Sequence, residues 1–267
     1  MVAARPDAFS VGLNGVFINN GSDWITKGGW DIPECTATNF NGCFIDNGDN
    51  GIRLVDVNGD GLTDWVKGKN HIGWIKINNG RTWIDDPQNI NIPDCFSGDD
   101  TNCFIANDAY NGVELVDVNG DEIVDIVKGN GSINKIWMGN GKNWFLDLSW
   151  GLENCPGTPT TNSCLVDAGD NGVRLVDLNG DGLTDVIKGE AGVSRAYINR
   201  QSGWAADPDS SGNPSPWRIP NCVSGNTAGC FVNSNGVDQG VRLIDINGDG
   251  LPDLVRAKIN SAGNGEQ

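Results

Sequence analysis

Four nearly identical segments recur along the chain, and they constrain its fold more than any other feature. They read GIRLVDVNGDGLTDWVKG, GVELVDVNGDEIVDIVKG, GVRLVDLNGDGLTDVIKG and GVRLIDINGDGLPDLVRA. Their first aspartates are Asp56, Asp117, Asp177 and Asp245, which lie 61, 60 and 68 residues apart. An insertion at 207–216, DPDSSGNPSP, accounts for the longer last interval and is expected to form an exposed loop. The 267-residue chain is therefore an array of one repeated unit.

Each repeat has the pattern of short β-strands and lacks the 3.6-residue apolar period of a helix. Runs such as VRLVD and LTDVIKG flank a tight polar loop, and Asn-Gly turns at 20–21, 79–80 and 140–141 favour hairpins. Four strands in about 60 residues are typical of a β-propeller blade, whereas a solenoid coil takes about 20 to 29 residues. We therefore predict an all-β propeller that forms one repeat domain over residues 1–267.

The chain begins and ends inside a repeat. The stretch VGLNGVFINNGSDW before Trp24 corresponds to SRAYINRQSGW before Trp204, and the last repeat stops after LPDLVRAKIN. The predicted divisions are a half-blade at about 11–30, blades at about 31–90, 91–150 and 151–217, and a half-blade at about 218–259. If the two halves pair, four blades result and no sheet edge stays open. Pairing within one chain and pairing between neighbouring chains, as swapped dimers or a filament, both agree with the sequence.

Every repeat also contains a nine-residue acidic loop with the spacing Asp-x-Asn-x-Asp-Gly-x-x-Asp. Side-chain oxygens at positions 1, 3, 5 and 9, with a backbone carbonyl at position 7, are donors that suit Ca²⁺. Asp, Asn and Gly also make good turns, but three carboxylates in so short a loop would repel one another without a cation. The predicted ligands are Asp56, Asn58, Asp60, Leu62 and Asp64; Asp117, Asn119, Asp121, Ile123 and Asp125; Asp177, Asn179, Asp181, Leu183 and Asp185; and Asp245, Asn247, Asp249, Leu251 and Asp253.

An EF-hand does not explain these loops. Position 12 should be a bidentate Glu, but it is Lys or Arg in every repeat, and the flanking segments are strands. The second loop differs from the others because Glu122 stands where Gly61, Gly182 and Gly250 supply a positive φ. We therefore expect up to four calcium ions, with the second site distorted, weak or empty.

These loops resemble the calcium-binding FG-GAP (VCBS-type) repeats of integrin-like β-propellers. The motif DVNGDGLTD, followed by a stretch of the form NNG…W…DP…IP, is especially similar to repeats in secreted bacterial Rhs and toxin-complex proteins. The resemblance extends from about Val11 to Ile259. It implies a propeller with calcium in a strand-to-strand loop of each blade. A cysteine pair in each blade and a total of only four blades are less usual for this family.

The eight cysteines form four local pairs, which we predict to be disulfides: Cys35–Cys43, Cys95–Cys103, Cys155–Cys164 and Cys222–Cys230. A thiolate metal site would favour closer C-x₂₋₄-C spacing. Eight bridged cysteines indicate an oxidising compartment, so we expect an extracellular or cell-surface protein. The N-terminal stretch has no apolar signal segment, so we expect a processed piece of a larger precursor. No apolar stretch is long enough to insert into a membrane.

Several other side chains are candidates for ligand binding or surface roles. Trp24, Trp83, Trp144 and Trp204 occupy the same place in each repeat, where they either pack one blade against the next or form a sugar-stacking surface. His71 is the only histidine, has no repeat counterpart and is expected at the surface. The sequons at Asn20 and Asn130 fit hairpin turns equally well.

The charge balance and the lack of a recognisable catalytic motif limit the classes of function that agree with the sequence. The net charge of −17 argues against nucleic acid and anionic membranes as partners. No Ser/His/Asp arrangement or phosphate loop is visible, and the recurring carboxylates are assigned to calcium, so we predict a protein that is not an enzyme. We predict a lectin-like or adhesive module for a glycan or an extracellular protein, because the segments HIGW, GSIN and AGVS vary between repeats. The alternative is a structural protomer that assembles into homo-oligomers by half-blade exchange.

Overall fold

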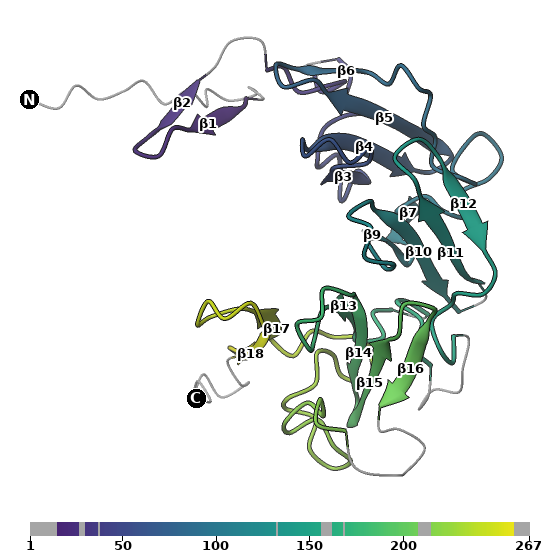
Figure 1. The fold of residues 1–267 in the computed structure, drawn as a ribbon, viewed down its shortest axis with the longest axis vertical. Coiled ribbons are helices and arrows are strands. Elements are labelled where there is room, and N and C mark those ends of the chain that lie inside the picture. Colours follow the sequence, from purple (N-terminus) through teal and green to yellow (C-terminus); the bar gives the residue numbers. More distant parts are fainter. Residues whose placement is uncertain are drawn as a thin grey trace, which may run out of the picture. The chain divides into compact units, whose positions relative to one another are not determined.

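A computed structural model of the chain describes residues 15–26, 30–36, 38–131, 133–155, 162–167, 169–207 and 215–258 (Figure 1). Within these ranges the secondary structure is entirely β, with no helix. Residues 11–14 and 27–29 of the predicted first half-blade, residue 259 of the last, and residues 208–214 of the insertion lie outside the described part of the chain. The strands are β1 (Phe17–Asn19), β2 (Trp24–Thr26), β3 (Ile52–Val55), β4 (Asp64–Lys69), β5 (Ile72–Asn78), β6 (Trp83–Asp85), β7 (Ile105–Ala106), β8 (Ala109–Tyr110), β9 (Val113–Val116), β10 (Asp125–Asn130), β11 (Ile133–Gly139), β12 (Trp144–Asp147), β13 (Val173–Val176), β14 (Asp185–Glu190), β15 (Val193–Asn199), β16 (Trp204–Asp207), β17 (Val241–Ile244) and β18 (Asp253–Arg256).

The strands form several small antiparallel sheets of one design. Strands β3 to β6, β9 to β12 and β13 to β16 each pair in sequence order as a four-stranded meander. The short strands β7 and β8 extend the first of these sheets through a parallel pairing of Lys69 with Ile105. Strands β1 and β2, and strands β17 and β18, form two-stranded hairpins. In every repeat the acidic loop joins the first strand of the sheet to the second.

The chain divides into two compact units, one with strands β1 to β8 and the other with strands β9 to β18. The first unit comprises residues up to 110 together with 141–143, and the second comprises the rest. The all-β prediction is thus confirmed for the described residues, as a set of small antiparallel sheets. A closed four-bladed ring stays a prediction.

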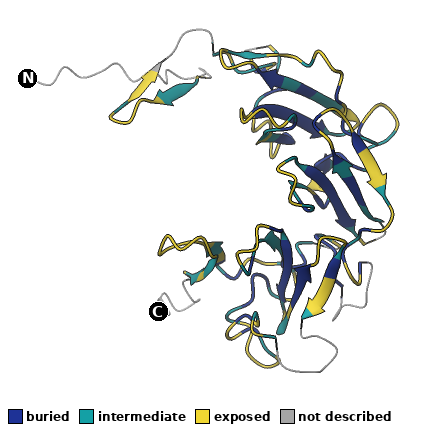
Figure 2. Ribbon diagram, in the orientation of Figure 1, coloured by how far each residue is buried: buried dark blue, intermediate teal, exposed yellow. Residues whose placement is uncertain are grey.

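The second strand of each full sheet is its most buried element (Figure 2). Strands β4, β10 and β14 are buried over their first five residues, of which only the second and third are apolar and large. Each also contains a fully buried lysine, Lys67, Lys128 or Lys188, whose amine donates to the backbone carbonyl of an asparagine 17 residues earlier. A hydrogen-bonded amine can be buried at this depth because its donors are satisfied.

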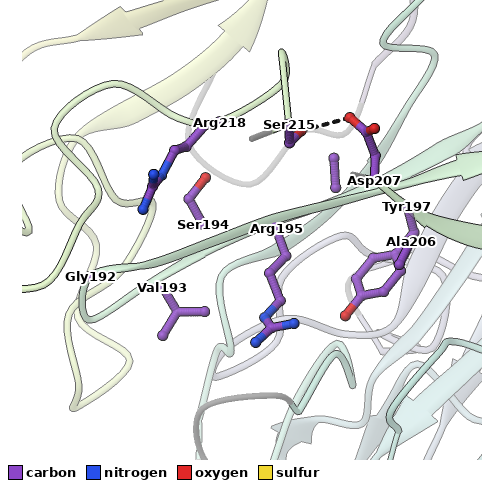
Figure 3. A pocket seen from close by; sticks show the side chains of 10 residues that line it. Gly192, Val193, Ser194, Arg195, Tyr197, Ala206, Asp207, Ser215 and Arg218 are labelled. Atoms are coloured by element: carbon purple, nitrogen blue, oxygen red, sulfur yellow. Dashed lines mark hydrogen bonds between the residues drawn. The ribbon is translucent and has the colours of Figure 1, made fainter. Parts of the chain in front are cut away.

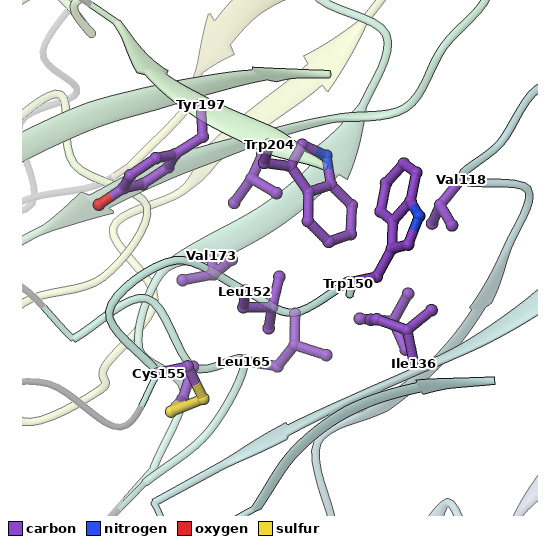
Figure 4. Packing of buried hydrophobic residues seen from close by; sticks show 12 residues of the cluster. Val118, Ile136, Trp150, Leu152, Cys155, Leu165, Val173, Tyr197 and Trp204 are labelled. Atoms are coloured by element: carbon purple, nitrogen blue, oxygen red, sulfur yellow. A yellow bond between two sulfur atoms is a disulfide. The ribbon is translucent and has the colours of Figure 1, made fainter. Parts of the chain in front are cut away.

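Tryptophans and one disulfide fill the space between the second and third repeats in the second unit (Figure 4). The rings of Trp150 and Trp204 meet edge to face with centroids 5.4 Å apart, and Val118, Ile136 and Leu152 pack in the same cluster. Cys155 and Cys164 belong to this cluster too. Burying these side chains together joins neighbouring repeats into one core.

The structure pairs all eight cysteines within their repeats, as Cys35–Cys43, Cys95–Cys103, Cys155–Cys164 and Cys222–Cys230. Each bond closes a short loop ahead of the first strand of its repeat. Four disulfides in one chain indicate an extracellular protein. The described residues include no helix with the length and apolarity of a membrane span.

Candidate functional sites in the acidic loops and the third repeat

The four acidic loops share one hydrogen-bonded scaffold. In the first, Asp56 Oδ1 accepts from the N–H of Gly59 at 2.8 Å and Oδ2 accepts from the N–H of Gly61 at 2.6 Å. The Oδ1 of Asn58 accepts from the N–H of Asp60 at 2.9 Å. The same three bonds recur in the other loops, which start at Asp117, Asp177 and Asp245. The loop therefore folds locally, from side chains that bind the backbone next to them.

The last aspartate of the loop has a different environment. Asp64, Asp125 and Asp185 are fully buried, and each accepts two backbone N–H bonds. One donor is the second loop residue, at 2.9 to 3.0 Å, and the other is the last residue of the third strand, at 2.7 Å. Burial raises the pKa of Asp64 and of Asp125 to about 6, and it also raises the pKa of Asp185. These aspartates tie the loop to the third strand of the sheet.

The second loop keeps the common backbone despite its substitution. Glu122 adopts a φ of 66°, close to the 81° of Gly61, and its N–H donates to Asp117 Oδ2 at 2.7 Å. The backbone of this loop therefore matches that of the other loops. A side chain in this left-handed region does cost conformational energy, which glycine avoids. A weaker second calcium site stays a prediction.

The loops contain the types of oxygen ligand that bind calcium, because each offers three carboxylates, an amide oxygen and a backbone carbonyl. In the described residues, however, no three acidic, histidine or cysteine side chains are gathered closely enough to hold a metal ion. The carboxylates instead accept hydrogen bonds from the loop backbone. Since each carboxylate oxygen has two lone pairs, these bonds leave acceptor capacity for a cation. Calcium binding is therefore compatible with the residues present and stays a prediction.

The repeated tryptophans bind the residue before the buried aspartate. The indole Nε1 atoms of Trp83, Trp144 and Trp204 donate to the carbonyls of Thr63, Val124 and Thr184 at 3.0, 2.9 and 2.7 Å. Trp144 and Trp204 are each only 8% exposed, so their ring faces are not available to a sugar. Trp144 and Trp204 therefore have a packing role. Trp24 differs, because it is 62% exposed.

The loop of the second repeat also contacts the third. Thr184 Oγ1 donates to the carbonyl of Asp117, and Asn199 Nδ2 donates to the carbonyl of Val118, both at 2.7 Å. Thr184 and Asn199 come from the loop and the third strand of the next repeat. The backbone of one acidic loop is thus held in place by the repeat that follows it.

His71 and the sequon residue Asn20 both lie in turns between strands. His71 is exposed in the turn between β4 and β5, with a φ of 68°. Asn20 lies in the β1–β2 turn, where its side-chain oxygen accepts from the backbone N–H groups of Ser22 and Asp23. The second sequon is only partly placed, because residue 132 lies outside the described residues.

A pocket of about 450 Å³ opens on the third repeat (Figure 3). Ser194 and Arg195 of β15, Asp207 of β16, and Ser215 and Arg218 of the following segment line it. The Oγ of Ser215 donates to Asp207 at 2.7 Å, and the N–H of Ile219 donates to Ser194 Oγ at 2.7 Å. These bonds hold Asp207, Ser215 and Ser194 in place. The guanidinium groups of Arg195 and Arg218 are then the candidate hydrogen-bond donors to a ligand.

This pocket is not among the sites predicted from the sequence, although two sequence features point to it. One was the variable segment AGVS at 191–194, and the other was the insertion at 207–216. Gly192, Val193 and Ser194 of the first, together with Asp207 and Ser215 of the second, line the pocket. The two stretches in which the third repeat departs from its neighbours therefore meet at one place.

Neither a protein-family model nor a curated protein matches the chain. Among solved structures, an Agrocybe aegerita lectin described as recognising non-reducing terminal N-acetylglucosamine is 19% identical, with a TM-score of 0.49 over 80% of this chain. A Photorhabdus luminescens Tc holotoxin pore is 18% identical, with a TM-score of 0.46 over 79% of this chain. The chain spans 50% of the lectin and 8% of the toxin chain.

Proposed function

We propose that this protein is a non-enzymatic extracellular binding module that recognises a polar ligand, a glycan or a segment of an extracellular protein, at the pocket of the third repeat. The observation that carries the proposal is the meeting of the AGVS segment and the insertion ends at that pocket. In a repeat array, the shared residues maintain the scaffold, whereas insertions into single repeats often form the binding face. The pocket is therefore where a specific function is expected.

The chemistry of the pocket favours a ligand rich in hydroxyl or carboxylate groups. Arg195 and Arg218 supply planar sets of N–H donors, and Asp207 and the serines supply acceptors. A volume of about 450 Å³ lies in the usual range of small-ligand sites. Asp207 is the one carboxylate among the described lining residues, whereas a glycosidase uses a pair. Binding without hydrolysis is the role that this lining supports.

The scaffold that we propose is a four-bladed β-propeller of the FG-GAP (VCBS) type, in which the first and last half-blades pair. Three sheets that share a four-stranded meander and four acidic loops with one scaffold support it. Calcium would be held by the first, third, fifth and ninth loop side chains, such as Asp177, Asn179, Asp181 and Asp185, with the carbonyl of Leu183. The ion would neutralise the loop carboxylates, which otherwise repel one another.

A structural role in an extracellular assembly is the second candidate. The observation in its favour is the exposure of Trp24 on the β1–β2 hairpin, because its counterparts Trp144 and Trp204 are buried. If a neighbouring chain covered this hairpin, half-blade exchange would build a dimer or a filament.

A glycan array, followed by calorimetry on the hits, tests the binding proposal. The variants are Arg195→Ala and, as a matched control, Lys135→Ala. These two residues hold the same register position, opposite Lys188 in the third repeat and opposite Lys128 in the second. We expect Arg195→Ala to weaken binding at least tenfold and Lys135→Ala to leave it unchanged. Equal effects of the two substitutions, or no binding by the wild type, would contradict the proposed site.

A further inference from the structure

The positive charge of the pocket comes from two arginines that are particular to the third repeat. Arg195 lies opposite the buried lysine of its sheet, where the first repeat has Trp74 and the second has Lys135. Arg218 stands four positions before the first cysteine of the following loop, and the two preceding cysteine loops have asparagine and glycine there. Among the three complete sheets, only the third therefore brings a guanidinium group to both positions.

A third substitution makes room beside these arginines. Ala206 lies opposite Tyr197, and the corresponding outer-strand residues are Asp85 in the first sheet and Leu146 in the second. A methyl group in place of these longer side chains leaves space next to strand β15, where the lining residues enclose about 450 Å³. The residues that differ between repeats thus determine both the charge and the size of the pocket.

Neither arginine of the pocket is paired within the protein. Three other arginines form an ion pair with the aspartate four residues before them: Arg53, Arg174 and Arg242. Within the described ranges, the side chains of Arg195 and Arg218 have no hydrogen bond or ion pair. Lys188, opposite Arg195, is neutralised by Glu190 at 2.6 Å. Since acidic residues outnumber basic ones by 35 to 18 in this chain, two unpaired arginines at one pocket indicate that a ligand supplies the counter-charge.

The two guanidinium groups lie on opposite faces of β15 (Figure 3). Ser194 and Arg195 are neighbours in a strand, so their side chains point to opposite faces. Arg218 lies on the side of Ser194, because the N–H of the next residue, Ile219, donates to Ser194 Oγ at 2.7 Å. A ligand that pairs with both arginines must therefore carry two anionic groups, one for each side of the strand.

The remaining lining suits the hydroxyl groups and the ring of a sugar. Asp207 accepts one hydrogen bond from Ser215 Oγ, and its other oxygen has lone pairs for a ligand hydroxyl. The Oγ of Ser194 accepts from a backbone N–H and still has its own hydrogen to donate. Val193 and Ala206 are small apolar groups against which the C–H face of a pyranose can pack.

We propose that the pocket binds an acidic oligosaccharide, with one carboxylate paired to Arg195 on one face of β15 and a second paired to Arg218 on the other. This inference rests on the proposed binding function and names its ligand class. A planar carboxylate matches the fork of N–H donors on a guanidinium group, which makes such pairs strong and directional.

An acidic peptide is a less suitable ligand for this place. A peptide that adds to a sheet needs a row of free main-chain groups along the edge strand. In the described part of the chain, β16 already pairs with Ala196–Asn199, so only Val193–Arg195 of β15 lie beyond that pairing. Three residues are too short an edge for strand addition, whereas a sugar uses side chains.

The net charge of −17 restricts the length of the ligand. At physiological ionic strength a charge is screened over about 8 Å, so the groups seated in the pocket interact chiefly with the adjacent arginines. The further charges of a long polyanion would instead meet an acidic protein surface. We therefore expect a short acidic oligosaccharide to bind at least as tightly as a long one.

The first test is calorimetry with two short probes, an oligogalacturonate with an acid on every sugar and a hyaluronan oligosaccharide with an acid on alternate sugars. Each is compared with the same probe after its carboxyl groups have been reduced to alcohols. We expect at least one acidic probe to bind, and its reduction to weaken binding by about tenfold or more. Absence of binding by both acidic probes, or equal binding of the reduced form, overturns the acidic ligand class. A neutral glycan whose binding depends on Arg195 would keep the proposed function and overturn only this inference.

The second test uses variants of the two arginines. Arg195→Gln and Arg218→Gln should each weaken binding of the acidic probe about tenfold, and the double variant about a hundredfold, because the two ion pairs are separate. Each variant should also make binding less sensitive to salt. Arg200→Gln is the charge-matched control, since Arg200 is exposed in the turn after β15 and is not a lining residue.

Three results would contradict the arrangement. An effect of only one arginine overturns the contact on both faces of β15. An equal effect of Arg200→Gln shows that net charge, and not the pocket, controls binding. A short polyglutamate peptide that displaces the sugar and binds more tightly assigns the pocket to a protein partner instead.

Discussion

The indole Nε1 of Trp204 donates a 2.7 Å hydrogen bond to the carbonyl oxygen of Thr184, the residue that precedes the buried Asp185. The bond joins the fourth strand of a sheet to the end of its acidic loop. Because Trp204 also packs on Trp150, one side chain connects the loop, the sheet and the core between repeats. The tryptophan is therefore a structural residue of the repeat.

Replacing this tryptophan should destabilise the protein without changing its ligand. Trp204→Phe keeps an aromatic ring but removes the N–H donor, while Asn199 Nδ2 still donates to the carbonyl of Thr184 at 3.0 Å. We expect a loss of about 0.5 to 1.5 kcal/mol from the hydrogen bond, measured by denaturant unfolding. Trp74→Phe on β5 is the control, because Trp74 takes no part in this contact. Equal losses from the two substitutions would show that the hydrogen bond is unimportant.

Removal of calcium should loosen the repeats. In a chelator at low ionic strength we expect a lower melting temperature, because the loop carboxylates repel one another. Added calcium should restore stability, and magnesium should not, because it demands a tighter octahedral site. Asp181→Ala should cost more stability in calcium than Asp121→Ala if the second site is the weaker one. A melting temperature that is the same in calcium and in chelator would contradict the calcium proposal.

The glutamate of the second loop offers a reciprocal test of backbone strain. Glu122→Gly should stabilise the protein by about 0.5 to 1 kcal/mol, because glycine adopts the φ of 66° without steric cost. Gly182→Glu places the same strain in the third loop and should destabilise it by a similar amount. Calcium titration of the two variants would show whether affinity follows. Opposite signs of the two stability changes are required, and like signs would refute the strain argument.

A buried lysine should make stability rise with pH on the alkaline side. Burial lowers the pKa of Lys67 to about 8 from 10.5, Lys69 lowers it further, and Asp46 and Asp49 act in the opposite direction. Between these two pKa values the unfolded chain holds a proton that the folded chain has released. Linkage then requires stability to increase with pH from about 8 to about 10.5.

Comparison with a variant isolates the lysine from other titrating groups. Lys67→Met removes the titration, so the stability difference between wild type and variant should depend on pH within that window and level off below it. Denaturant unfolding at several pH values measures this difference. If the difference were constant from pH 7 to 10, the lowered pKa would be wrong.

The local structure of each repeat was predictable from the sequence because its interactions are local. Asp56 binds backbone groups three and five residues ahead, so the spacing of the motif specifies the loop. The strands on both sides of the loop follow from their β-branched runs. The backbone of the second loop was harder to predict, since Glu122 accepts a conformation that is more usual for glycine.

The pocket could not be predicted from spacing alone. Arg195 and Arg218 are 23 positions apart in the sequence, and only the packing of the segment after β16 against β15 brings both to one pocket. Neither residue belongs to a motif. The burial of Trp144 and Trp204 likewise depends on packing, which a repeat position does not reveal.

The bonds from Thr184 and Asn199 to the second acidic loop end on the backbone carbonyls of Asp117 and Val118. Every residue type presents such a carbonyl, so the receiving repeat needs no particular side chain at these points. A copy of the repeat inserted by gene duplication would find the same acceptors already in place. Only the following repeat needs particular side chains, and a repeat that has threonine and asparagine at these two positions could follow any other without a change on the acceptor side.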